Sequence, residues 1–152
     1  MNIVYFDYGG SHSSVLAANI HTGQIGTAPP FKEQVMALPY FDKTTPSDFG
    51  KLKYVGDDPE DNQVYALGTK QSDCLNVLNG LVDLMGIRDR FVFADTMPYV
   101  NLTMRIGGWF SRTLALTSIG RPIVLRGTKN IFPHLVGLVE RTKLQMTQGD
   151  GQ

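Results

Sequence analysis

The sequence predicts an α/β domain, because strand-like and helix-like segments alternate along it. Segments 3–6, 91–94 and 123–125 are rich in β-branched and aromatic residues, and each is followed by a helical pattern. This alternation is typical of a parallel sheet whose connecting helices cover both faces. We therefore expect a three-layer sandwich with a mainly parallel sheet, Rossmann-like or P-loop-like, in which these segments are adjacent core strands, together with one β-hairpin excursion.

The remaining elements follow from periodicity and from turn residues. Segments 51–56 and 63–69 have strand patterns and flank an acidic, turn-rich connection, which indicates a β-hairpin. Leu75, Leu78 and Val82 recur at helical spacing. Helices are predicted at 15–20, 31–38, 72–85, 101–114 and 131–146, with Pro133 in the first turn of the last one.

Length and composition bound the organisation and exclude some functions. We expect one α/β domain over residues 1–146 and a disordered tail over 147–152. Lys plus Arg and Asp plus Glu are 14 each, which argues against general nucleic-acid binding. The single cysteine, Cys74, excludes an internal disulfide and a multi-cysteine metal site. No signal peptide or membrane span is recognisable, so a cytoplasmic setting without membrane association is expected.

The segment from Asp7 to Ile20 predicts a site. A strand ends at Gly9-Gly10, four polar residues follow, and an apolar helical segment begins at Val15. A glycine-rich loop that opens a helix presents backbone N–H groups and the positive end of the helix dipole to an anion. The loop has neither the Lys-Ser/Thr of a Walker A motif nor the spacing of a dinucleotide fingerprint. A capped turn is the simpler interpretation, but His12 and three serines exceed what a cap needs.

Loops that follow parallel strands meet at one edge of the sheet, where ligands bind. We expect three loops there: the Gly9–Ser14 loop, the 95–101 loop and the 126–130 loop. Their polar groups favour a phosphorylated ligand. The candidate ligand-binding residues are Gly9, Gly10, Ser11, Ser13, Ser14, Thr96, Asn101, Arg105, Gly127, Thr128 and Lys129.

Three residues are candidates for catalysis: His12, Asp7 and Asp95. His12 lies in the loop itself and could act as ligand, acid, base or nucleophile. Asp7, at the end of the first strand, could hold a metal or orient His12, or could cap a turn. No metal site is predicted from the residues, and Mg²⁺ enters only as a companion of phosphoryl transfer. His134 is more readily structural than catalytic.

Two functions of different classes remain open at this stage. The first is binding of a phosphorylated small molecule or nucleotide at the Gly9–Ser14 loop. The second is phosphoryl transfer or hydrolysis that uses His12 supported by Asp7 or Asp95. No catalytic lysine and no pair of metal-binding carboxylates lies in the loop, so binding is favoured. A third alternative is a subunit of a protein complex, and a homodimer is compatible with the sequence.

Several short motifs together carry a resemblance: Tyr8-Gly-Gly-Ser-His-Ser-Ser14, Leu38-Pro-Tyr-Phe-Asp42, Pro98-Tyr-Val-Asn101, Met104-Arg-Ile-Gly-Gly108 and Gly120-Arg-Pro122. Their combination, with Gly127-Thr128, resembles an uncharacterised family of bacterial proteins, largely from Firmicutes, known as a domain of unknown function. The resemblance covers nearly the whole chain. It implies a bacterial, cytoplasmic, single-domain protein, and it assigns no catalytic residue.

Overall fold

A four-stranded mixed sheet forms the centre of the computed structural model, which describes residues 1–30, 32–99 and 117–149. The strand order is β2-β3-β1-β4. β1 pairs in parallel with both β3 and β4, and β2 pairs antiparallel with β3. The strands are β1 (Asn2–Asp7), β2 (Lys53–Asp57), β3 (Gln63–Gly68) and β4 (Phe91–Asp95).

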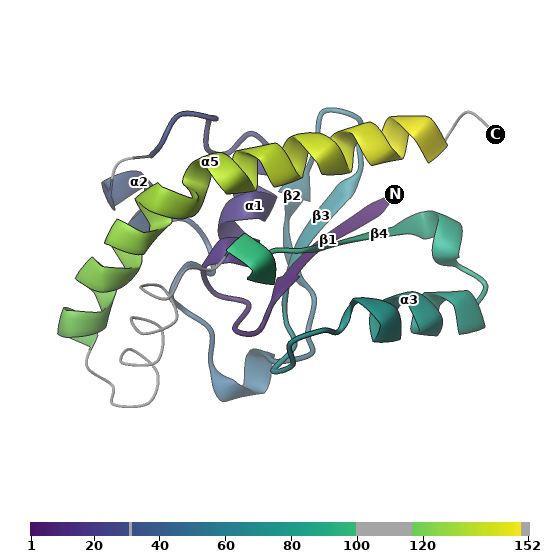
Figure 1. Cartoon of the computed structure of the whole chain (residues 1–152), viewed down its shortest axis with the longest axis horizontal. Helices are drawn as coiled ribbons and strands as arrows, with labels where there is room; N and C mark the ends of the chain where they lie inside the picture. Colours follow the sequence, from purple (N-terminus) through teal and green to yellow (C-terminus); the bar gives the residue numbers. More distant parts are fainter. Residues whose placement is uncertain (31, 100–116, 150–152) are drawn as a thin grey trace.

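Helices lie on both sides of the strands (Figure 1). The long helix α5 extends along one side, over α1, and α3 lies on the other side of the strands. The α-helices of the described residues are α1 (Ser13–His21), α2 (Lys32–Ala37), α3 (Leu75–Leu84) and α5 (Thr117–Gly149). Short 3-10 helices are η1 (Pro46–Asp48), η2 (Arg88–Arg90) and η3 (Met97–Tyr99).

The alternating side chains of β1 divide the core into two clusters. Ile3 and Tyr5 pack in the cluster that contains α1 and the described part of α5, whereas Val4 and Phe6 pack with residues of α3. Successive side chains of a strand point to opposite faces, so an unbroken apolar strand needs cover on both. All nine residues of α1 are buried, since α1 lies between the sheet and α5.

The connections between the strands define where a site can form. The chain passes from β1 through α1 and α2 to the edge strand β2 and then to β3, and it returns past β1 to β4 through α3. These two connections run in opposite directions across the sheet. If both crossovers are right-handed, their helices lie on opposite faces of the sheet. The strand order therefore switches between β1 and β3, and ligands of such sheets bind outside the carboxyl ends of the strands at this point.

The expected hairpin is confirmed, and so is the parallel pairing of the strands at 3–6 and 91–94. The hairpin extends the sheet instead of projecting from it, because β3 pairs in parallel with β1. β3 thereby takes the place beside β1 that the sequence assigns to 123–125.

The predicted third strand at 123–125 is wrong, because these residues lie inside α5. The predicted loop at 126–130 is also helical, and the expected helix at 131–146 is only the second half of α5. A short apolar run between glycines reads equally well as a buried strand or as part of a helix, and here the helix prevails. Pro133 lies in the interior of α5, where it removes one backbone hydrogen bond, and α5 bends along its course (Figure 1).

Two other expectations concern the ends of described segments. α5 includes residues 147–149, which the sequence assigns to a tail. The helix expected at 101–114 lies outside the described residues. No helix of the described ranges is long and apolar enough to cross a membrane.

Candidate functional site

The Asp7 carboxylate organises the loop between β1 and α1. Its Oδ1 accepts hydrogen bonds from the backbone N–H groups of Gly9, at 2.7 Å, and Gly10. Its Oδ2 accepts from the Ser13 hydroxyl at 2.7 Å and from the Ser14 backbone N–H at 2.9 Å. Asp7 is only 5% exposed, so this network stands in for water around a buried carboxylate. An internal anion thus already meets three of the N–H groups that the sequence offers to a ligand.

Other donors of the loop are not used in this way. The backbone N–H groups of Ser11, His12 and Ser13 have no hydrogen-bond acceptor among the described residues. The buried Ser14 hydroxyl likewise has no partner there. The first N–H groups of a helix lack intrahelical partners and carry its positive dipole end. Within the described residues, the start of α1 therefore carries N–H groups that no carbonyl or side chain of the loop satisfies.

Gly10 has a positive φ of 60° and lies against the backbone of Gly68 at the end of β3. A Cβ at position 10 would be 2.4 Å from the Gly68 nitrogen, and a Cβ at position 68 would be 2.9 Å from the Gly9 carbonyl. The glycines therefore allow two backbones to touch at the switch point between β1 and β3. The small size of Gly10 is thus required by the contact with β3.

His12 forms a buried pair with Asp42. The His12 Nε2 lies 3.2 Å from the Asp42 Oδ1, and the two side chains are 7% and 8% exposed. The His12 ring also contacts Phe41 edge-on, with centroids 5.3 Å apart. The backbone N–H of Asp42 donates to the Ser11 carbonyl at 3.0 Å, which ties this corner to the loop. Asp42, with a positive φ of 53°, thus holds the imidazole in one orientation.

Asp7 and Asp95, the two carboxylates expected to support His12, make other contacts in the structure. Asp95 Oδ1 accepts from the Met97 backbone N–H at 2.8 Å. Partial burial, and secondarily the nearby charge of Asp7, raise the pKa of Asp95. Asp42 belongs to the Leu38–Asp42 motif, but no spacing rule connects it with His12.

Thr96 is fully buried and links the end of β4 to the loop. Its Oγ1 lies 2.9 Å from the Ser13 Oγ, to which it can donate while Ser13 donates to Asp7. The same oxygen lies 3.0 Å from the Phe6 carbonyl. Thr96, which follows β4, therefore supports the Asp7 carboxylate through Ser13 of α1.

Lys53 is a buried cation beside the loop that the sequence analysis missed. Its Nζ donates to the Gly10 carbonyl at 2.9 Å and to the Thr44 hydroxyl, and Thr44 also donates to that carbonyl at 2.8 Å. The sequence does indicate that Lys53 is buried, because Lys53 is two residues before the buried Val55 and therefore lies on the same face of β2 as Val55. A lysine in phase with core residues is unusual and marks a place where its charge is needed.

The loop expected at 126–130 does not exist as a loop, because these residues are helical. Gly127, Thr128 and Lys129 lie within α5, with Thr128 buried and Lys129 exposed. Asn101 and Arg105 lie outside the described residues. His134 packs on the Tyr99 ring, with centroids 6.3 Å apart and planes 17° apart. Within the described ranges no group of three or more His, Cys, Asp or Glu side chains could hold a metal ion.

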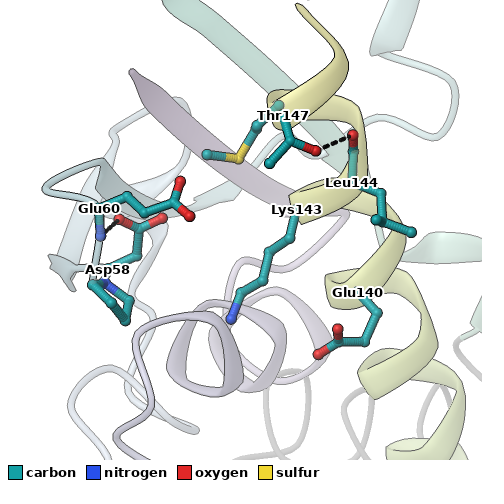
Figure 2. A pocket seen from close by; sticks show the side chains of 8 residues that line it. Asp58, Glu60, Glu140, Lys143, Leu144 and Thr147 are labelled. Carbon is teal, nitrogen blue, oxygen red and sulfur yellow. Dashed lines mark hydrogen bonds between the residues drawn. The ribbon is translucent and has the colours of Figure 1, made fainter. Parts of the chain in front are cut away.

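A cavity of about 170 Å³ lies away from this loop, at the amino end of β1 (Figure 2). The Asp58–Glu60 turn between β2 and β3 lines one side, and residues of the last turns of α5, including Glu140 and Lys143, line the other. Asp58 also reaches the buried His21. The sequence places Asp58 and Glu60 in an acidic turn and Glu140 and Lys143 in a helix, and only the fold brings the two segments together.

The fold thus defines an α/β protein with a Gly-Gly strand-to-helix loop at a switch point of its sheet. Residues 2–144 match a family model whose description is Protein of unknown function (DUF3189), and the chain belongs to that family. This confirms the resemblance to a domain-of-unknown-function family. Searches of curated proteins and of solved structures returned no match.

Proposed function

We propose that the protein binds a phosphorylated small molecule or nucleotide at the Gly9–Ser14 loop. The observation that carries the proposal is the set of unused donors at the start of α1. The backbone N–H groups of Ser11, His12 and Ser13 have no acceptor among the described residues, although these residues are buried. Buried N–H groups are almost always paired, and N–H groups at the start of a helix are well suited to an oxyanion.

Two side chains beside the loop support this ligand class, Lys53 by its positive charge and Asp7 by fixing the shape of the loop. Asp7 accepts hydrogen bonds from the N–H groups of Gly9, Gly10 and Ser14, and these bonds fix the conformation of the loop without a ligand. Lys53 donates to the Gly10 carbonyl and brings a positive charge to the back of the loop. A preorganised loop loses little conformational entropy on binding, which favours affinity.

A matched pair of lysine variants tests the role of charge beside the loop. Lys53→Gln should weaken binding of inorganic phosphate and of ATP, whereas Lys51→Gln, at an exposed position two residues away, should not. Binding is measured by calorimetry and by ¹⁵N amide shifts of residues 9–14. The proposal fails if the amides of Ser11 to Ser13 do not shift at saturating phosphate or ATP in the wild-type protein.

One observation favours hydrolysis or phosphoryl transfer as a second candidate. The Asp42 carboxylate orients His12 through Nε2, and Nδ1 has no partner among the described residues. A carboxylate-held imidazole with one free nitrogen is the arrangement of a general base. His12→Gln should abolish turnover of a phosphorylated substrate if this candidate is right, and should only lower affinity if the site binds without catalysis.

A further inference from the structure

The two faces of the sheet are covered unequally. Apolar residues of α1, α2 and α5 belong to the larger core cluster, whereas α3 contributes the helical residues of the cluster on the other face. In that smaller cluster only Val4, Phe6 and Leu67 are buried. Phe91 and Phe93 of β4, whose stacked rings have centroids 5.7 Å apart, are half-buried there. The α3 side of the sheet therefore keeps apolar surface that the described residues leave exposed.

The outward face of α3 is itself apolar. Val77, Leu81 and Leu84 are 69%, 54% and 86% exposed. These positions are four and three residues apart, so the three side chains form one stripe along the helix, which we call the α3 stripe. The only charged residue of α3, Asp83, lies off the stripe and pairs with Arg88 at 3.8 Å. Contiguous exposed apolar side chains of this kind mark contact surfaces.

The composition of α3 favours a protein surface over a membrane as the occupant of the stripe. A helix that lies in a membrane interface typically carries Lys and Arg on its polar face. α3 contains neither, and its polar residues are Asn76, Asn79 and Asp83. The occupant that fits is an apolar, uncharged protein surface, which a second copy of this chain offers. The chain has a formal net charge of zero, so two copies approach each other without strong repulsion.

The α3 stripe is complementary to itself about a two-fold axis. If two α3 helices pack antiparallel with Leu81 next to the axis, Val77 of one copy lies opposite Leu84 of the other, because these positions are four residues before and three residues after Leu81. The start of each helix then lies beside the end of the other. Asp73, exposed just before α3, thereby comes near Arg88 of the second copy, whose side chain is 52% exposed in its pair with Asp83.

We propose that the outward face of α3 is a self-association surface, on which two copies of the chain pack their α3 helices antiparallel about a two-fold axis beside Leu81. This face lies on the opposite side of the strands from α5 (Figure 1). The proposal uses no residue of the Gly9–Ser14 loop, so it does not depend on the proposed ligand.

The size of the helix pair sets the strength of the association. The 10 residues of α3 span about 15 Å, so two such helices form a contact smaller than the about 800 Å² per partner of a standard interface. Two copies held by a contact of this size dissociate on dilution. The mass of the protein in solution should therefore depend on its concentration.

Sedimentation equilibrium from micromolar to millimolar protein measures this dependence. The wild-type chain should pass from monomer to dimer. Leu81→Glu should raise the dimer dissociation constant roughly hundredfold or more, because it sets two carboxylates against each other at the axis. Leu144→Glu is the matched control: Leu144 of α5 is 60% exposed on the other side of the sheet, so this substitution should leave the dissociation constant unchanged.

A charge-pair test decides the identity of the partner and the orientation of the helices. Val77→Glu alone and Leu84→Lys alone should each weaken association, because a charge then faces an apolar side chain. Both changes in one chain should restore the dimer, since each glutamate then lies opposite a lysine of the other copy. Val77→Glu combined with Leu84→Glu should stay monomeric. Both positions are exposed in the single chain, so the variants should keep the wild-type circular dichroism spectrum.

Three outcomes would overturn the proposal. A wild-type chain that stays monomeric at millimolar concentration has no such surface, and this measurement needs no variant. If that monomer sediments with phosphatidylcholine vesicles, the stripe binds lipid instead. A dimer that Leu81→Glu leaves intact uses another surface. Failure of the Val77→Glu and Leu84→Lys pair to restore association excludes the antiparallel arrangement.

Discussion

Replacing Asp7 by Asn tests whether this carboxylate builds the loop. An asparagine keeps one acceptor oxygen, but its NH₂ group then faces one of the two donor pairs: the Gly9 and Gly10 N–H groups, or the Ser13 hydroxyl and Ser14 N–H. Two donors thus lose their acceptor in a site that is 5% exposed. Asp7→Asn should therefore destabilise the domain although its side chain is almost isosteric.

The magnitude follows from the number of bonds lost. A hydrogen bond to a charged group contributes about 1.5–3 kcal/mol, so two of them correspond to about 3–6 kcal/mol. Domains of this size have about 5–15 kcal/mol of stability and lose roughly 2–4 °C of Tm per kcal/mol. The expected fall in Tm is then at least about 6 °C, using the lower limits of both ranges.

Urea denaturation followed by circular dichroism at pH 7.5 measures the change in unfolding free energy. Asp83→Asn is the matched control, because Asp83 is exposed and forms a surface ion pair with Arg88 at 3.8 Å. Such pairs contribute little, so this substitution should leave the urea midpoint unchanged. The reasoning is refuted if Asp7→Asn unfolds within about 1 kcal/mol of the wild-type protein, since the carboxylate then contributes less than one charged hydrogen bond.

Two further predictions concern neighbouring positions. Gly10→Ala should lower the urea midpoint strongly, because its Cβ would lie 2.4 Å from the Gly68 backbone and the φ of Gly10 is +60°. Gly80→Ala is the control: this glycine of α3 faces open space, so the alanine should raise the free energy of unfolding by about 0.5–1 kcal/mol. Equal effects of the two substitutions would contradict the contact between Gly10 and Gly68. Asp95→Asn should stabilise the protein at pH 7, because the raised pKa of Asp95 means that its charged form is disfavoured in the folded state. In urea denaturation, this gain in the free energy of unfolding should shrink as the pH falls towards the pKa of the carboxyl. A gain that does not change with pH would exclude this cause.

Local chemistry was enough to predict the loop and two of its flanking elements. The β-branched run at 3–6, the pair Gly9-Gly10 and the apolar helix up to Gly23 specify strand, turn and helix through contacts within a few residues. Gly23 has the positive φ of 73° expected after a helix end. The hairpin was predictable for the same reason, because its turn residues lie between two strand patterns.

The partners of the site residues depended on long-range packing. Asp42 reaches His12 across 30 positions, and Lys53 reaches Gly10 across 43. No periodic pattern connects such pairs, because the contact depends on how β2 and the corner at 38–42 come back to the loop. The position of Asp7 in the sequence is compatible with three roles: holding a metal, orienting His12 or capping a turn. In the structure its carboxylate accepts hydrogen bonds from four donors of the loop and so holds the turn.

The segment 123–125 marks the limit of reading a sequence locally. Its apolar residues are compatible with a strand and with a helix, and the alternation of strand and helix patterns favoured a strand. In the fold β3 already occupies the position beside β1, and the chain continues as the single helix α5 over the buried α1. The sequence by itself determined the strand, the loop and the helix of the site, because these depend on neighbouring residues. Only the tertiary structure decided which strand lies beside β1 and which charges face the histidines, because burial and long-range pairing choose among locally equivalent conformations.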